Sequence, residues 1–353
     1  MSDVAVADRG DAVDHGAPHA KPTKRRMAGM LGVFLAAMVA GLNHRVGVIA
    51  LADVRAALGV GLDEGSWLTT AYAAGELIAM PFAPWFAITF SVRRFHLWMV
   101  GASVALAAVL PFVQDLSLAL GLRFVQGICS GTLIPILMML ALKVMPPHVR
   151  LYGLALYAMT ATFVPNFSIW MAGQWTDALA DWRWVYWQIV PLLLVAGFLV
   201  GWGLPREPIQ TERIRQANWP GVTIGATALG LIAVALDQGV RMDWFNSPWV
   251  TTSLLGGLVL LFVYLMTEWY HPSPFLKLQI LGRRNLCLGL VLLVLLLLVL
   301  PAGALLPSQY LGQVQQYRAL QTAPLGLILA LPQLVLGPAV ALGSSSFRVD
   351  APR

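Results

Sequence analysis

The chain has 353 residues, of which 58% are hydrophobic and only 11% are charged, and its mean hydropathy is +0.72. A soluble domain carries roughly 25% charged residues, so this composition excludes a water-soluble globular protein. The net charge of +6 does not indicate nucleic-acid binding, because the basic residues fall in short clusters between apolar segments.

Ten apolar stretches follow one another along the chain, each close to the roughly 20 residues that a helix needs to cross a bilayer. The predicted transmembrane helices are 28–51, 66–89, 97–114, 116–141, 149–173, 184–204, 219–239, 249–269, 286–311 and 322–343. Transmembrane β-strands alternate in polarity and are about ten residues long, whereas these apolar runs are continuous. The expected fold class is therefore all-α, a polytopic membrane protein.

The polar segments divide the chain into five predicted regions. These are a disordered cytoplasmic tail (1–27), a six-helix lobe (28–204), a cytoplasmic linker (205–218), a second helical region of four helices (219–343) and a polar C-terminal tail (344–353). Six helices followed by a polar linker are typical of a two-lobed transporter, but an ordinary loop between helices explains the linker equally well.

Lysine and arginine residues set the expected orientation. With the N-terminus inside, 17 of the 23 basic residues lie in inner segments, and four lie in outer loops, namely Arg55, Arg183, Arg241 and Arg318. Cytoplasmic segments are enriched in lysine and arginine, so both termini are expected in the cytoplasm of a bacterial inner-membrane protein.

Glu76 is the most informative single residue, because it is an acid deep within a predicted membrane helix. It lies about ten residues, or about 15 Å, into the second helix, near the bilayer midplane. A carboxylate there costs several kcal/mol unless it faces a cavity, finds a partner or is protonated. Either it exchanges a proton during function, or it is a protonated group that packs helices together. Tyr72 lies one turn earlier and is a cavity candidate.

Arg123 is the second charged residue at membrane depth, about 10 Å from the outer end of the fourth predicted helix. Gln126 and Gly127 share its helix face, and Gly127 with Gly131 forms a pair that lets a neighbouring backbone approach closely. We expect Arg123 and Glu76 to pair across a cavity as proton-coupling residues. The alternative is that Arg123 reaches the outer headgroups.

Other polar groups receive weaker predictions. Asn43 and Asn166 are substrate-cavity candidates, together with Tyr72 and Gln126, whereas Arg45 points away from Asn43. The aromatic residues at the start of the sixth helix are interpreted as interfacial anchors, namely Trp182, Trp184, Tyr186 and Trp187.

The sequence gives no indication of an enzyme. It contains no Walker loop, HExxH or GxSxG motif, and its two cysteines, Cys129 and Cys287, form no metal-ligand spacing. We therefore expect no catalytic residue, cofactor or metal.

Several segments resemble the Major Facilitator Superfamily, specifically the drug:proton antiporters of the EmrB/QacA type, which have about fourteen helices. The resemblance runs from about residue 28 to 342. It rests on Arg123 to Gly127 (RFVQG) with Gly131, and on three later segments in the same order, 182–191, 236–248 and 274–286. Pro165 and Gly173 persist from the helix 5 antiporter motif, here SIWMAG, and are expected to serve helix packing.

The sequence also departs from this family. Where the first helix usually carries an acid, this chain has Leu42-Asn43-His44-Arg45, which makes Glu76 the natural substitute. Pro84 and Ile88 replace the usual Gly and Asp of the loop after the second helix. Family members continue beyond Gly343, so the sequence suggests a shortened chain.

The resemblance implies a proton-coupled exporter of drugs or small amphipathic molecules that works by alternating access. Its partners would be a small-molecule substrate, protons and the bilayer, with a periplasmic adaptor and an outer-membrane channel also implied, and no nucleic acid. Two alternatives stay open. One is a uniporter or anionic-metabolite carrier without proton coupling, and the other is a truncated fragment that does not transport.

Overall fold

The computed structural model describes residues 24–144, 150–282 and 284–346, and this part of the chain is mostly helical and contains no β-strand. Residues 1–23 and 347–353, which belong to the two predicted tails, lie outside the described residues. The all-α fold is confirmed.

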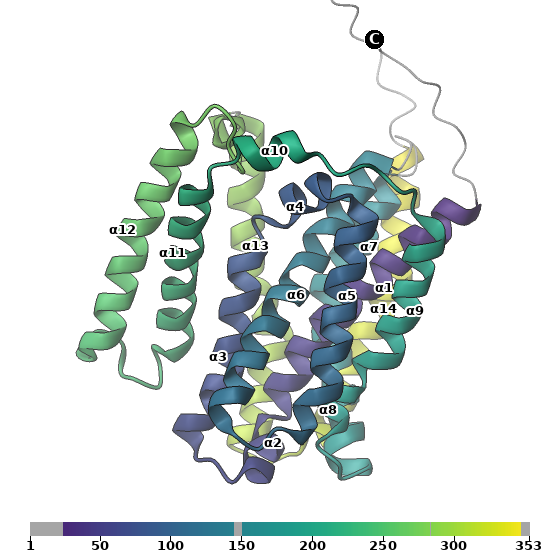
Figure 1. Ribbon diagram of the computed structural model, residues 1–353. Coiled ribbons are helices and arrows are strands. Elements are labelled where there is room, and N and C mark those ends of the chain that lie inside the picture. Colours follow the sequence, from purple (N-terminus) through teal and green to yellow (C-terminus); the bar gives the residue numbers. More distant parts are fainter. Residues whose placement is uncertain (1–23, 145–149, 283, 347–353) are drawn as a thin grey trace, which may run out of the picture.

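The long helices run in roughly the same direction, whereas the short helix α10 lies across one end of the bundle (Figure 1). Their bounds are α1 (Lys24–Ile49), α2 (Leu51–Leu58), α3 (Leu62–Ala79), α4 (Ala83–Thr89), α5 (Val92–Val109), α6 (Leu116–Val144), α7 (Arg150–Gly173), α8 (Trp184–Trp187), α9 (Ile189–Gly203), α10 (Thr211–Gln216), α11 (Trp219–Gln238), α12 (Pro248–Tyr270), α13 (Arg284–Gln313) and α14 (Ala319–Ser346). Short helical turns η1 (Leu110–Phe112), η2 (Gln174–Ala178), η3 (Trp244–Asn246) and η4 (Leu278–Gly282) occur in the connections.

The length and composition of these helices fit a multi-pass membrane protein. Among the described residues, seven helices are long and apolar enough to cross a membrane, or eight if the bent pair α3–α4 is one span. Helices α13 and α14 add 30 and 28 residues of mostly apolar sequence. The polytopic helical bundle is therefore confirmed.

Helix α1 lies at the centre of the first six spans, where it packs against α9, α7 and α6. Val33, Ala36 and Ala37 on α1 are completely buried, because small side chains let the neighbouring helices approach. Helix α3 packs along α6, and this contact positions the polar side chains described below.

The second predicted helix is not continuous. It breaks between α3 and α4, whose axes meet at 57°. Pro81 lies in the break and has no N–H to donate, and Pro84 is the second residue of α4. The apolar run that predicted one continuous helix therefore contains a bend. Glu76 lies about one helical turn before this bend.

Several boundaries also differ from the predicted ones. Residues 24–27, assigned to the N-terminal tail, begin α1, and residues 344–346, assigned to the C-terminal tail, continue α14. The connection after the first helix contains α2, and the linker 205–218 contains α10. Figure 1 shows α4 and α10 at one end of the bundle and α2 and α8 at the other.

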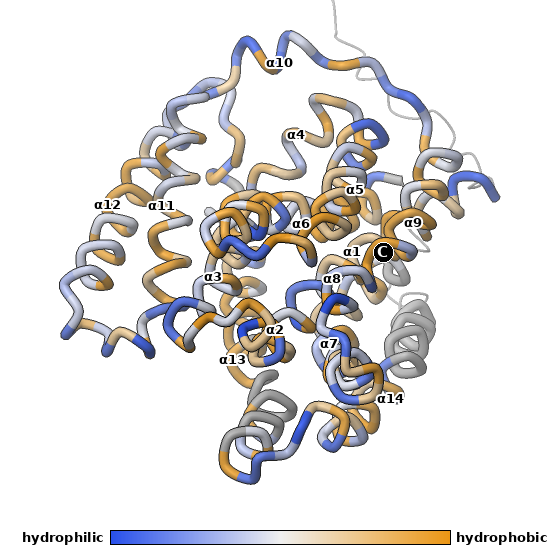
Figure 2. Tube along the Cα trace, turned by 60° about the horizontal axis from the view of Figure 1, so that its bottom comes forward, coloured by the Kyte–Doolittle hydropathy of each residue, from blue (hydrophilic) through white to orange (hydrophobic). Residues whose placement is uncertain are grey.

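Helices α11 and α12 form a hairpin that packs against α3 (Figure 1). Figure 2 shows hydrophilic residues in the connection between these two helices and along α10. Glu268 lies near the end of α12, at the opposite end of the hairpin from this connection, and is completely buried. Its carboxylate accepts hydrogen bonds from Asn218 Nδ2 at 3.0 Å and from the Leu276 backbone N–H at 3.1 Å. Because both oxygens have donors, this buried acid is explained by local structure.

Candidate functional site

The crossing of α3 and α6 depends on three glycines, Gly75 on α3 and Gly127 and Gly131 on α6. A Cβ at Gly127 would lie 2.9 Å from the Tyr72 carbonyl carbon, and one at Gly131 would lie 2.8 Å from the Glu76 Cα. A Cβ at Gly75 would overlap the Phe124 carbonyl oxygen. The absence of side chains therefore brings the backbones of the two helices into contact, beside Tyr72 and Glu76.

Glu76 pairs with His44 of α1. The His44 Nδ1 lies 2.8 Å from the Glu76 Oε2, and the two side chains are 25% and 14% exposed. His44 also meets the Tyr72 ring edge-on, with ring centroids 5.3 Å apart. Both side chains are ionisable and lie within hydrogen-bond distance of each other, so this pair is the strongest candidate for proton exchange among the described residues.

The Arg123 side chain is buried, with a relative exposure of 2%, and it lies between aromatic rings. Its guanidinium carbon is 4.3 Å from the Tyr72 ring centroid and 5.5 Å from that of Tyr186. Its Nη1 donates to the Gln126 Oε1 at 2.7 Å. A Cβ at Gly47 of α1 would lie 3.0 Å from Arg123 Nη2, so Gly47 leaves the space that the guanidinium occupies. Cation–π contacts stabilise a desolvated cation of this kind.

Asn43 completes the arrangement, since it is buried on α1 next to Tyr72. Its Nδ2 donates to the Tyr72 hydroxyl at 3.3 Å, and that hydroxyl donates to the Ala40 carbonyl at 3.4 Å. We refer to His44, Glu76, Asn43, Tyr72, Arg123 and Gln126 as the central polar cluster. Arg45, one residue beyond His44, is exposed.

Two predictions about this region need correction. Glu76 pairs with His44, whereas Arg123 binds Gln126 and stacks on tyrosines, so the expected Arg123–Glu76 pair is absent from the described contacts. Tyr186, interpreted as an interfacial anchor, is buried and contacts Arg123. Both differences arise from the rotation of helices about their axes, which depth alone does not fix.

The remaining predicted residues lie on α7, where it packs along α14. Asn166 is buried there, and its Nδ2 donates to the Thr162 carbonyl at 2.9 Å. Pro165 is inside α7, and a Cβ at Gly173 would lie 2.6 Å from the Leu320 N of α14. These residues therefore belong to the α7–α14 contact, which is separate from the central polar cluster.

Some buried polar atoms of the predicted cavity residues have no hydrogen-bond partner among the described residues. They are Asn43 Oδ1, Arg123 Nε, Gln126 Nε2 and Asn166 Oδ1. Such atoms are rare in folded proteins, where an ordered water or a polar ligand group satisfies them. The described residues contain no group of three His, Cys, Asp or Glu placed to hold a metal ion.

His44 is the functional candidate that the sequence left unassigned. It was visible between Asn43 and Arg45, and the signal was an ionisable side chain in the same helix turn as a predicted cavity residue. Its partner became evident only from the packing of α1 beside α3.

Polar contacts of Arg318 with Asp177 and Asp53, which we call the Arg318 clasp, join the start of α14 to the first six spans near α2. Arg318, just before α14, places its Nε 2.6 Å from Asp177 Oδ1 and its Nη2 3.4 Å from Asp53 Oδ1. The Leu320 backbone N–H donates to Asp177 Oδ2 at 2.9 Å. The hydrogen bond to Asp177 and the two acidic charges raise the pKa of Arg318 above its ordinary value, so its charge is permanent.

A second set of polar contacts joins α11 to α3 at the same end. Arg241 Nη1 lies 3.0 Å from Asp63 Oδ1, and the Gln238 Nε2 donates to the Thr70 hydroxyl at 2.5 Å. Asp237 is exposed and also accepts a hydrogen bond from Thr70. Both contact sets link helices far apart in the chain, so they hold this end of the bundle together.

Comparison with known proteins gives a consistent result. A family profile described as Major Facilitator Superfamily matches residues 32–348. The chain is 26% identical to the "Probable multidrug resistance protein EmrY" of Escherichia coli over 311 residues, which are 87% of this chain and 60% of the relative. The "Multidrug export protein EmrB" of Escherichia coli is 25% identical with the same coverage. The "Fatty acid resistance protein FarB" of Neisseria gonorrhoeae is 25% identical over 84% of this chain and 59% of the relative. The chain thus spans about 60% of the length of these curated relatives.

Proposed function

The chain belongs to the Major Facilitator Superfamily, and on this premise we propose that it is a proton-coupled transporter that exports small amphipathic molecules from the cell. The names of the relatives record multidrug export and resistance to drugs or fatty acids, which supports this substrate class. Transport, rather than catalysis, is the activity that the helical bundle and its buried polar cluster favour.

The His44–Glu76 pair is the observation that carries this proposal. An ionised carboxylate at membrane depth is costly, so Glu76 is stabilised either by a positive charge on His44 or by its own proton. Adding one proton to the pair removes the attraction between α1 and α3 that an ion pair provides. Proton binding therefore alters the contact between these two helices directly.

Arg123 provides a fixed positive charge near this pair. It stacks on Tyr72, whose ring also touches His44, so the guanidinium and the imidazole share one aromatic neighbour. We propose that Arg123 takes part in proton exchange at the His44–Glu76 pair through this shared contact with Tyr72.

A row of aromatic rings on α7 supplies an apolar surface for substrate. The rings of Phe163 and Phe167 stack with their centroids 5.2 Å apart, and the ring centroids of Phe167 and Trp170 are 5.3 Å apart. Phe163 and Phe167 pack with Leu42 of α1, which directly precedes Asn43. An aromatic substrate would rest on these rings and direct a polar group to the unpaired Asn43 Oδ1.

In the proposed cycle, Glu76 takes a proton from the outer side and releases it to the cytoplasm, while substrate moves outward. The positive-inside distribution supports cytoplasmic termini in an inner membrane. A periplasmic adaptor and an outer-membrane channel remain proposed partners, on the resemblance to exporters of this type alone.

Transport by everted membrane vesicles tests this function. The chain is expressed, the vesicle interior is made acidic, and accumulation of an amphipathic aromatic dye such as ethidium is followed by fluorescence. We expect accumulation that vanishes when nigericin collapses the pH gradient. Vesicles that accumulate no member of a panel of such dyes above an empty-vector control would contradict the proposal.

The buried Arg123 favours one second candidate, a carrier of anionic metabolites that works without proton coupling. Arg123 has no acidic partner among the described contacts, and its Nε is unpaired. Equilibration of an anionic substrate that ignores the pH gradient but requires Arg123 would support this carrier. Arg45 does not contribute, since it is exposed.

The Arg318 clasp is expected to keep the outer end closed. Arg318→Gln removes both ion pairs, and exposed pairs contribute about 0.2–1 kcal/mol each, so the open population should rise roughly fivefold. The measurement is the rate at which an impermeant maleimide labels Ala323→Cys, a buried position on α14, in a chain whose two native cysteines are serine.

Arg183→Gln is the matched control for this experiment. Arg183 is exposed near the same end and has no ion pair among the described contacts. Equal labelling rates for Arg318→Gln and Arg183→Gln would show that the clasp does not restrain opening.

A further inference from the structure

A basic pocket lies at the end of the bundle opposite the Arg318 clasp. It has a volume of about 570 Å³ and is formed where α1, α5 and the segment after α9 meet. Four arginines line it together with a short backbone segment, namely Arg25, Arg26, Arg93 and Arg206 with Gly203, Leu204 and Pro205. This pocket is remote in the fold from the central polar cluster.

Close helix packing builds this pocket. A Cβ at Gly29 of α1 would lie 2.9 Å from the Gly203 carbonyl carbon, and one at Gly203 would lie 2.6 Å from the Arg25 carbonyl oxygen. The two glycines therefore bring the start of α1 against the end of α9. As a result, Arg25 lies beside the backbone segment that lines the pocket.

Backbone carbonyls hold two of the four guanidinium groups in place. The Arg25 Nε donates to the Trp202 carbonyl at 2.6 Å, and the Arg93 Nη1 donates to the Leu204 carbonyl at 3.4 Å. Each of these bonds uses one N–H, and an arginine side chain has five. Most donors of both residues therefore stay available for a ligand.

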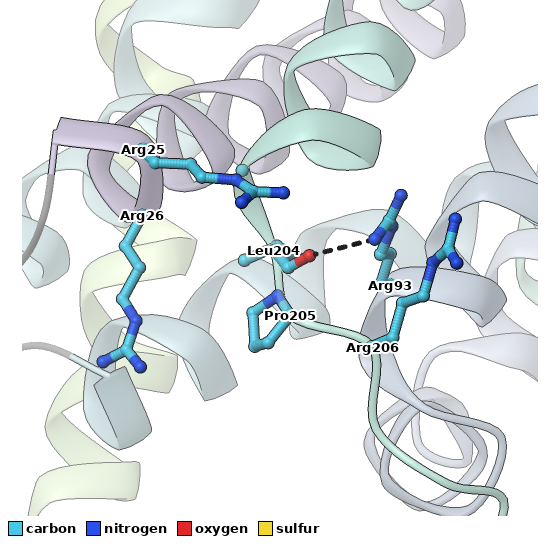
Figure 3. A pocket seen from close by; sticks show the side chains of 7 residues that line it. Arg25, Arg26, Arg93, Leu204, Pro205 and Arg206 are labelled. Carbon is cyan, nitrogen blue, oxygen red and sulfur yellow. Dashed lines mark hydrogen bonds between the residues drawn. The ribbon is translucent and has the colours of Figure 1, made fainter.

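The positive charge of the pocket is uncompensated within the described residues. None of its four arginines forms an ion pair there, and the neighbouring acid Glu207 lies 3.9 Å from Lys143. In Figure 3, Arg93 and Arg206 lie next to each other, Arg25 turns toward them, and Arg26 points away. Three like charges that converge on one cavity repel one another, and a bound anion would offset this repulsion.

We propose that this pocket binds the phosphate group of an anionic ligand through Arg25, Arg93 and Arg206. Guanidinium groups match the geometry of phosphate oxygens and form paired, charge-assisted hydrogen bonds with them. Two sources offer this chemistry, an anionic phospholipid headgroup and a soluble phosphate. Basic pockets at the ends of membrane helices suit lipid headgroups, so the headgroup is the occupant that we expect.

Binding to the purified full chain tests this site. The titrants are short-chain phosphatidylglycerol, short-chain phosphatidylcholine and inorganic phosphate, and affinity is measured by thermophoresis in detergent. In Arg93→Gln/Arg206→Gln the affinity for phosphatidylglycerol should fall about 30-fold, since each basic residue near an anionic surface contributes roughly fivefold. Arg206 lies between helices, so the single variant Arg206→Gln is expected to fold normally and to lower the affinity for phosphatidylglycerol about fivefold. It keeps the test valid if the double variant misfolds.

Arg94→Gln/Arg215→Gln is the matched control. Both residues are exposed at the same end of the bundle and neither lines the pocket, so the same charge is removed without changing the site. Saturable binding of phosphatidylglycerol alone identifies a lipid site, and equally tight binding of inorganic phosphate identifies a soluble ligand. An equal loss of affinity in the control pair, or no saturable binding of either anion, overturns the proposal.

Discussion

Glu76→Gln is expected to abolish accumulation of substrate against its gradient while leaving substrate exchange intact. With one proton exchanged per substrate, a pH difference of about one unit represents 1.36 kcal/mol and sustains about tenfold accumulation. The variant has no proton to exchange, so its accumulation ratio should approach one. Glutamine keeps a carbonyl oxygen for the bond to His44, and the α1–α3 contact is therefore retained.

The measurement compares driven uptake with substrate counterflow in the same vesicles. Glu64→Gln is the matched control, because Glu64 is an exposed acid in the first turn of the same helix, α3. Accumulation by Glu76→Gln that equals that of the wild-type chain would exclude Glu76 from proton coupling. Loss of both driven uptake and counterflow would assign Glu76 a structural role.

Gly131→Val is expected to destabilise the protein and to displace Glu76. A Cβ at this position would lie 2.8 Å from the Glu76 Cα, and a backbone atom cannot rotate away as a side-chain tip does. Helices α3 and α6 would have to separate, at a cost of about 1–3 kcal/mol for overpacking. The apparent unfolding temperature in detergent should fall, and coupled uptake should fall with it.

Gly121→Ala on the same helix is the control for this prediction. A Cβ at Gly121 has no atom within 4 Å, so alanine should raise stability by roughly 0.5–1 kcal/mol through its better helix propensity. If Gly131→Val were as stable as Gly121→Ala, the close α3–α6 contact would not exist in the membrane.

The sequence was sufficient to predict the helical bundle, because continuous apolar runs of about 20 residues leave no other way to satisfy the backbone in lipid. It did not predict the bend between α3 and α4, since Pro81 lies within such a run and hydropathy does not register a missing N–H donor. The extra helix α2 was missed for a related reason, because it is too short to span a membrane.

The same distinction applies to the central polar cluster. The Arg123–Gln126 contact and the Gly127–Gly131 pair follow from spacing within one helix, and the structure places them on one face. The partner of Glu76 depends on how α1 and α6 are rotated toward α3, which depth along a helix does not determine. His44 was therefore unassigned, and Arg123 was expected in its place.

Proton release on substrate binding tests the central claim most directly. The purified chain is placed in weakly buffered detergent solution with a pH indicator, and ethidium or another transported dye is added over a series of pH values. We predict proton release from the wild-type chain and from Glu64→Gln, and none from Glu76→Gln. Equal release from the wild-type chain and Glu76→Gln would contradict the assignment of the His44–Glu76 pair as the proton-exchanging site.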